Sequence, residues 1–200
     1  MLEKKEGKGM QIHQREIPSS LSLPLPLYET IPLADVESRD GSVFTLSVGL
    51  SEVEVDQLRA LSLDETDEAI QTLTSDRKRF GEGSYESWYA KGRVPFVLTE
   101  QSSGALAALV WLGREIPHGA SEDIDWHTIA YRAYPPFRGA GIMKGFSQFV
   151  LDIYAKQYPK AKIWAGINAK NEASAGLALA LGFEKSDELS NSAQSVMIQK

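Results

Sequence analysis

The chain has 200 residues, of which 42% are hydrophobic and none is cysteine, and its formal net charge is −6. The length is enough to bury a core without cross-links, and the lack of cysteine excludes disulfides, thiolate nucleophiles and thiolate metal sites. The acidic charge disfavours nucleic-acid binding, because phosphate contacts need clustered lysine and arginine, and it favours a cationic or neutral small substrate.

Residues 1–41 are expected to form a partly irregular N-terminal arm. Residues 1–27 are first charged and then rich in serine and proline, and Pro24 and Pro26 block a helix and disfavour a central strand. We interpret them as a loose, surface-draped lead-in. They lack the apolar segment of a signal peptide, and no run in the chain reaches the roughly 20 apolar residues of a membrane span. The sequence therefore favours a cytoplasmic protein with no membrane partner.

The folded domain is expected to begin with a strand and two helices. Residues 42–50 alternate in polarity and are rich in β-forming residues, which predicts a strand. Ser51 begins a helix with acidic residues in its first turn, and Asp64 or Thr66 is expected to cap a second helix. Residues 75–91 are polar with embedded aromatic residues, and we expect helix and loop there.

The rest of the domain is predicted to build on a central hairpin. Two apolar runs, VPFVLTE and ALAALVWLG, flank a polar turn with Gly104, which predicts a hairpin covered on both faces. A strand over residues 124–133, a helix from Met143 to Tyr158, a further strand, a helix ending at Gly182 and a final strand follow. This irregular order predicts an α/β mixture around one sheet, without regular βαβ alternation.

A turn rich in proline and glycine, residues 134–143 (YPPFRGAGIM), joins a predicted strand to a predicted helix. Pro135 and Pro136 remove two backbone donors and end the strand. Gly139 and Gly141 have no Cβ, so a ligand can approach their backbone closely. The first amides of the following helix have no partner within it and attract phosphate. The alternative is an ordinary glycine turn, but the whole combination favours a pyrophosphate site.

This turn resembles the acyl-CoA pyrophosphate loop of the GNAT N-acetyltransferase family. Arg138, Gly141 and Ile142 match the family pattern, whereas Met143 stands where glycine or alanine is usual. The resemblance implies that acetyl-CoA is the co-substrate and that the preceding strand offers backbone groups to its pantetheine and acetyl parts. The residues assigned to the coenzyme are Tyr131, Arg132, Ala133, Arg138, Gly139, Ala140, Gly141, Ile142, Met143, Asn171 and Ser174.

Residues 171–183 are similar to a later helix of the same family. Gly182 suits the left-handed position after a helix, and Asn171 either caps the helix or contacts pantetheine. Ala178 stands where many relatives have a tyrosine that acts as general acid, so the thiolate leaves unaided, another group protonates it, or catalysis is absent. Together the two segments imply that residues 42–200 adopt the GNAT fold, an α/β (α+β) fold with a mixed, mostly antiparallel sheet flanked by helices.

Acetylation of an amine requires a base or a path for its proton to water. Asp125 lies where some relatives place a carboxylate, and His127 shares its strand face, so both are candidate bases. The alternative is that both are structural. Arg132 and Tyr134 are interpreted as surface residues at the strand end. The aromatic and charged segment 76–91 is our expected wall of the acceptor pocket.

The sequence therefore predicts an acetyl-CoA-dependent N-acetyltransferase whose acceptor is a small-molecule or peptide amine that attacks the thioester directly. The alternative is a GNAT-fold module that binds acyl-CoA or a partner without catalysis. A dinucleotide-binding Rossmann domain is a third interpretation, but its third glycine would be Gly145, one position late. The three histidines are far apart, which argues against a zinc site. A homodimer is left open.

Overall fold

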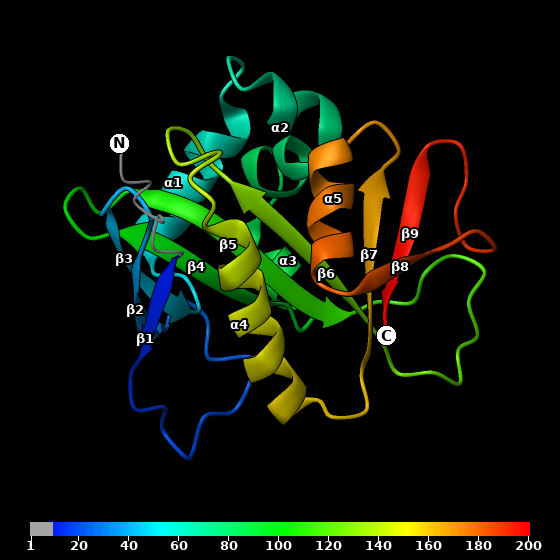
Figure 1. Cartoon of the computed structure of the whole chain (residues 1–200), viewed down its shortest axis with the longest axis horizontal. Coiled ribbons are helices and arrows are strands. Elements are labelled where there is room, and N and C mark those ends of the chain that lie inside the picture. The colour runs from blue at the N-terminus through cyan, green and yellow to red at the C-terminus, as the bar shows by residue number, and fades with distance from the viewer. Residues whose placement is uncertain (1–9) are drawn as a thin grey trace, which may run out of the picture.

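The computed structural model describes residues 10–200, and nine strands in this range form one sheet (Figure 1). In chain order the strands are β1 (Gln11–Gln14), β2 (Ile31–Glu37), β3 (Val43–Val48), β4 (Val94–Glu100), β5 (Leu106–Arg114), β6 (Trp126–Ala133), β7 (Lys162–Asn168), β8 (Phe183–Ser186) and β9 (Gln194–Gln199). Their order across the sheet is β1-β2-β3-β4-β5-β6-β7-β9-β8, and only β6 and β7 pair in parallel. The predicted mixed, mostly antiparallel sheet is confirmed.

Helices cover both faces of the sheet, as predicted. On one face lie α1 (Glu52–Leu63), α2 (Glu68–Leu73), the π-helical turn η1 (Arg77–Gly81) and α3 (Tyr85–Tyr89), and on the other lie α4 (Met143–Gln157) and α5 (Glu172–Ala180). None of the helices within residues 10–200 is long and apolar enough to cross a membrane.

The central hairpin β4–β5 separates two cores, because its residues alternate between the faces. Phe96 and Leu98 pack with α4 in the larger core, whereas Val97 and Trp111 pack with α1 and α3 in the second. Burial on both sides explains why these strands read as continuous apolar runs. The predicted central place of the hairpin is confirmed, since β4 pairs with β3 and β5 pairs with β6.

The N-terminal segment differs from the expected loose arm. β1 pairs with β2 and β2 pairs with β3, so both strands extend the sheet. Leu23 and Leu25 are buried in the larger core, and the hydroxyl of Tyr158 donates to the carbonyl of Leu23 at 2.6 Å. The short β1 and the proline at position 32 of β2 conceal both strands from a pattern-based prediction. Residues 1–9 of the expected arm lie outside the described residues.

The two parallel strands separate after a short shared stretch. β6 and β7 pair only from Trp126–Lys162 to Thr128–Trp164, whereas β6 stays paired with β5 as far as Ala133. Figure 1 shows the two strands diverging from this shared end, with α5 beside the opening. The divergence leaves a gap in the middle of the sheet.

Candidate functional site

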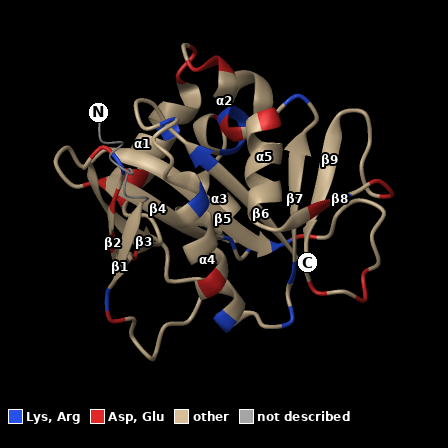
Figure 2. Ribbon diagram, in the orientation of Figure 1, with Lys and Arg blue, Asp and Glu red and all other residues tan. Residues whose placement is uncertain are grey.

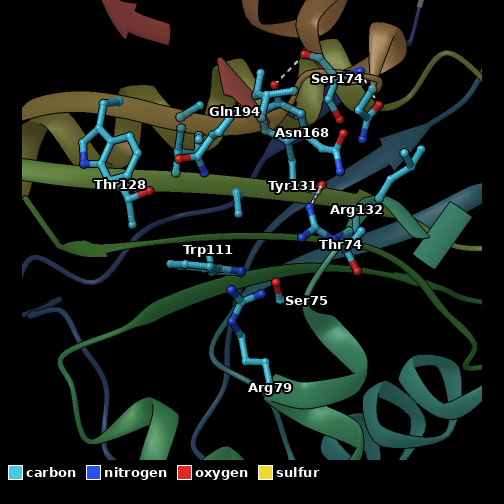
Figure 3. A pocket seen from close by; sticks show the side chains of 18 of the residues that line it. Thr74, Ser75, Arg79, Trp111, Thr128, Tyr131, Arg132, Asn168, Ser174 and Gln194 are labelled. Carbon is cyan, nitrogen blue, oxygen red and sulfur yellow. Dashed lines mark hydrogen bonds between the residues drawn. The ribbon is translucent and has the colours of Figure 1, made fainter. Parts of the chain in front are cut away.

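A cavity of about 290 Å³ lies where β6 and β7 separate, and we call it the inter-strand cavity (Figure 3). Its walls come from β5, β6, β7, η1, the end of α2 and the segment after it, the start of α5 and the start of β9. The side chains that line it include Thr74, Ser75, Arg79, Trp111, Glu115, Thr128, Tyr131, Arg132, Asn168, Asn171, Ser174 and Gln194. Most of these are polar, so the cavity suits a hydrophilic ligand.

A second cavity, of about 490 Å³, adjoins the first at the end of β6, and we call it the loop cavity. It lies between α2, the turn after β6 and the first turns of α4 and α5, and many of its side chains are apolar, including Ile70, Phe137 and Leu177. Both cavities are lined by Leu73, Thr74, Tyr131, Arg132, Asn171 and Ser174. The shared walls place the two cavities side by side along β6.

The main chain of β6 at Tyr131 and Ala133 faces the gap. The amide of Tyr134 donates to the carbonyl of Ala107 on β5. Successive amides along a strand point to opposite neighbours, so the amides of Tyr131 and Ala133 point toward β7. The ladder between β6 and β7 has already ended at Thr128–Trp164, so these amides have no partner among the described strands. They can donate to a ligand lying in the gap.

The turn before α4 exposes helix amides to the loop cavity. Gly139 and Gly141 have φ of +79° and +73°, and a Cβ at either position would meet no atom within 4 Å. α4 follows Ile142, whose side chain makes no capping hydrogen bond, and Lys144 lines the cavity beside it. A helix N-terminus without a side-chain cap presents free amides and the positive end of the helix dipole, which suits a phosphate group.

Arg138 is held by the protein itself. Its Nη1 and Nη2 donate to the carboxylate of Asp67 at 2.7 and 2.5 Å, and its Nε donates to the carbonyl of Ala133 at 2.7 Å. All three nitrogens of the guanidinium therefore have protein acceptors, and the side chain ties the turn to α2. Its assignment to the pyrophosphate stays a prediction.

Asp67 is the cap of α2, so neither Asp64 nor Thr66 has the expected role. Its side chain is 4% exposed and accepts a hydrogen bond from the amide of Ile70. Burial alone would raise the pKa of Asp67, but the hydrogen bonds from Arg138 and Ile70 hold it below its ordinary value. The carboxylate is thus ionised and depends on its arginine.

Arg138→Ala is expected to lower the free energy of unfolding by about 1–3 kcal/mol, because it leaves the buried carboxylate of Asp67 without its cation. Urea denaturation of the unliganded protein measures this loss. Arg15→Ala is the matched control, since it breaks an exposed ion pair with Asp35 and should cost less than about 1 kcal/mol. Equal stability of the two variants, together with weaker acetyl-CoA binding by Arg138→Ala alone, would instead favour a role limited to the pyrophosphate.

Asp125 and His127 lie side by side at the start of β6, but neither lines the inter-strand cavity or the loop cavity. His127 is 5% exposed, with Nδ1 2.6 Å from the hydroxyl of Tyr154 and Nε2 3.3 Å from a carboxylate oxygen of Asp125. Burial lowers the pKa of His127, although the carboxylate of Asp125 acts in the opposite direction. The assignment of either residue as a base stays a prediction.

The buried histidine is expected to make stability depend on pH. Because the pKa of His127 is lower in the folded chain than in the unfolded one, its contribution is complete above about pH 6.5 and is lost as the pH falls through the folded pKa. His127→Gln should reduce this loss, as measured by thermal melts between pH 8 and pH 5. His118→Gln, at an exposed position, is the control. The same decline in wild type and His127→Gln would contradict the expectation.

The first turn of α5 borders both cavities. Asn171 caps the helix by accepting from the amide of Ser174 at 3.0 Å, which confirms the interpretation as a helix-start residue. Ala178 is fully buried in the larger core and lines neither cavity. A tyrosine at this position would therefore overpack the core. The hydroxyl of Tyr131 instead spans from β6 to α5, donating to the carbonyl of Ser174 at 2.7 Å.

A buried cluster of charged side chains borders the inter-strand cavity. Asp76 is fully buried and accepts from both Arg79, at 2.7 Å, and Arg132, at 2.5 and 3.2 Å. Arg93 pairs with Glu115 at 2.6 Å, and its guanidinium carbon lies 5.1 Å from the centre of the Trp111 ring. These contacts bring together residues far apart in the chain.

The expected surface position of Tyr134 needs correction, whereas the expected acceptor wall stays a prediction. Tyr134 is fully buried rather than exposed. From the segment 76–91, only Arg79 is among the described residues that line the inter-strand cavity. The aromatic residues of this segment pack in the second core, and Phe80 and Tyr85 also line a separate cavity of about 360 Å³ beside α1. Spacing alone does not distinguish a core aromatic residue from one that lines a pocket.

Comparisons with known proteins agree with this geometry. Residues 47–184 match the model of the family described as "Acetyltransferase (GNAT) domain". The GNAT domain of PAT from S. lividans has 16% identity and a TM-score of 0.61, over 82% of this chain and 94% of that one. A putative GnaT-family acetyltransferase from Bordetella pertussis has 20% identity and a TM-score of 0.57, over 76% and 93%.

A chimera of spermidine N-acetyltransferase SpeG from Vibrio cholerae and hSSAT has 13% identity and a TM-score of 0.54, over 77% of this chain and 94% of that one. These solved structures share the fold with this chain. No curated protein matches the chain significantly. The family match covers more than half of the chain and agrees with the strand order and with the glycine turn before α4. The chain therefore belongs to the GNAT acetyltransferase family.

Proposed function

We propose that the protein is an acetyl-CoA-dependent N-acetyltransferase whose acceptor is a small-molecule or peptide amine. The observation that carries the proposal is the pair of adjoining cavities along β6. One ends at uncapped helix amides and has apolar walls, and the other is polar and opens between the separated strands. This arrangement supplies one compartment for a coenzyme and one for an acceptor.

The residues present fit the coenzyme. The amides at the start of α4, with Lys144 beside them, would hold the pyrophosphate, and the open space at Gly139 and Gly141 allows the close approach that this requires. The amides of Tyr131 and Ala133 would hold the pantetheine and acetyl parts. Bound acetyl-CoA supplies an acetyl thioester that an amine can attack.

The chain's own groups then have defined tasks. The amide of Tyr131 faces the gap and can donate to the negative oxygen that develops when the amine attacks the carbonyl carbon. The amine would enter from the inter-strand cavity, and its proton would leave to a base or to water. The Tyr131 hydroxyl is protonated at neutral pH, burial raises its pKa further, and it already donates to the carbonyl of Ser174. Asp125 or His127 as the base stays a prediction.

The second candidate is a GNAT-fold module that binds acyl-CoA without catalysis. Neither candidate base, Asp125 or His127, lines either cavity, which favours this module, and Ala178 is packed in the core and supplies no acid for a leaving thiolate. A thiolate is, however, a tolerable leaving group near neutral pH. Both candidates predict coenzyme binding, and they differ in turnover.

The test has two stages. Thermal shift with CoA, acetyl-CoA, NAD and ATP should show stabilisation by the CoA species only. Thiol release from acetyl-CoA is then measured with a panel of amines. Release that depends on an amine supports the transferase, and binding without release supports the module. Stabilisation by NAD or ATP but not by CoA would overturn both.

A further inference from the structure

We propose that the acceptor amine carries a carboxylate and that Arg79 and Trp111 bind this carboxylate in the inter-strand cavity. The inference rests on the proposed transfer reaction and names its substrate class. It departs from the expectation, drawn from the net charge of the whole chain, of a cationic or neutral substrate. The local charge of a cavity decides which ligand enters it, and here the local charge is of the opposite sign.

The charged side chains around the inter-strand cavity are mostly arginines. Those that line it directly are Arg79, Arg132 and Glu115. Behind them lie Asp76, which pairs with both lining arginines, and Arg93, which pairs with Glu115. Three guanidinium groups thus share two carboxylates and leave one net positive charge. Arg79 comes from η1, and Figure 2 shows a basic position at the end of β6, where Arg132 lies.

The guanidinium of Arg79 has N–H groups that are not used by the described part of the protein. Its Nη1 donates to Asp76, and no other hydrogen bond of its guanidinium occurs within the described residues. The same carboxylate also serves Arg132 through both of its oxygens. Burial lowers the pKa of Arg79 although Asp76 acts in the opposite direction, as expected for a cation with too little negative charge around it. A ligand carboxylate would supply that charge, and one of its oxygens would accept a charge-assisted hydrogen bond from a free nitrogen of Arg79.

The indole of Trp111 supplies a second, independent donor. Its side chain lines the cavity and the residue is only 4% exposed, yet Nε1 has no hydrogen-bond partner within the described residues. The guanidinium carbon of Arg79 lies 5.2 Å from the centre of the Trp111 ring, and Figure 3 shows the two side chains next to each other. Buried N–H groups are rarely left unpaired, so an acceptor oxygen is expected here. A carboxylate has one oxygen for each of the two side chains.

The same walls disfavour a polyamine. A spermidine N-acetyltransferase is among the proteins of similar fold, so this class of acceptor is the natural comparison. A polyamine has no carboxylate to pair with Arg79, and its remaining ammonium groups would meet guanidinium groups. Like charges brought together in a cavity cost binding energy.

The proposal is tested by binding, without coenzyme or turnover. The indole N–H resonance of Trp111, assigned with Trp111→Phe, is followed by NMR during titration. N-acetylglycine presents an α-carboxylate, as a free amino acid does. The α-amide of N-acetylaspartate presents a side-chain carboxylate instead, as an acidic first residue of a peptide does. N-acetylglycinamide is the matched neutral probe, and spermidine is the cationic one.

We expect at least one carboxylate probe to shift the resonance saturably at millimolar concentrations and to bind at least 10-fold more tightly than N-acetylglycinamide and spermidine. Whichever carboxylate probe binds more tightly identifies the source of the carboxylate. Arg79→Gln should weaken that binding at least 10-fold, with part of it kept in Arg79→Lys. Arg77→Gln is the control, since Arg77 lies in the same turn and does not line the cavity.

The fold should survive Arg79→Gln, because Asp76 keeps its pair with Arg132, and circular dichroism checks this. Equal binding of acid and amide, preference for spermidine, no binding of either carboxylate probe, or binding unchanged by Arg79→Gln would each overturn the proposal. None of these outcomes depends on acetyl transfer. A failed transfer assay would overturn the proposed function and the ligand's role as acceptor, but it would leave the carboxylate-binding site itself standing.

Discussion

Gly49→Ala is expected to be strongly destabilising, lowering the free energy of unfolding by about 4 kcal/mol or more. Gly49 directly follows β3 and has φ of +83°, a conformation that costs an alanine about 1–2 kcal/mol. A Cβ there would also overlap the carbonyl oxygen of Glu29, which is main chain and cannot rotate away. The residue is buried, and its amide donates to the carbonyl of Pro95 on β4. Relief by movement would therefore disturb the pairing of β3 with its neighbour.

Gly41→Ala separates these two contributions. Gly41 has φ of +87° in the exposed turn between β2 and β3, and a Cβ there would meet no atom within 4 Å. It should lose only the conformational part, about 1–2 kcal/mol. Denaturant titrations of the two variants measure the difference. Losses of equal size would show that the contact with Glu29 relaxes without cost.

Gly141→Val should weaken acetyl-CoA binding by at least about 1.5–3 kcal/mol, which corresponds to between about 10-fold and about 150-fold in Kd. Gly141 has φ of +73° in the turn that leads into α4, and the space where its Cβ would lie is open. In the proposed complex this space is taken by the pyrophosphate, so two methyl groups would keep the phosphates from the helix amides. Isothermal titration with acetyl-CoA gives the affinity.

Gly104→Val is the matched control for the backbone strain. Gly104 has φ of +70° in the turn between β4 and β5, also with open space around a Cβ, and it lines neither cavity. Both variants should lose similar stability, and only Gly141→Val should lose affinity. Unchanged affinity in Gly141→Val would remove the pyrophosphate from this turn, and equal weakening in both variants would point to a general loss of structure.

Features encoded in short stretches of sequence could be predicted. The glycines before α4, the cap at Asn171 and the left-handed Gly182 each depend on a few neighbouring residues, and the structure has all three at the expected positions. The hairpin β4–β5 was also predictable, because burial on both faces leaves continuous apolar runs. In each instance the local preference and the tertiary structure favour the same conformation.

Contacts between distant residues could not be predicted. The pairs Asp76–Arg132 and Asp67–Arg138 join positions 56 and 71 residues apart, and no spacing rule connects them. For the same reason the sequence shows Arg138 as a free cation, although the fold commits it to a buried carboxylate. The orientation of Ala178 was equally hidden, because α5 is rich in alanine and has little contrast between polar and apolar faces.

The short ladder between β6 and β7 also divides the sheet into two blocks of continuous chain. Strands β1 to β6 precede the turn at residues 134–142, and β7, β8 and β9 follow it, so the C-terminal block meets the rest of the sheet through only three paired positions. Such a seam is where a protein opens without unfolding globally. A molecule bound in the gap would contact both blocks and reduce local opening between them. Hydrogen exchange along β9, of which only the first residue, Gln194, lines the inter-strand cavity, would then report whether that cavity is occupied.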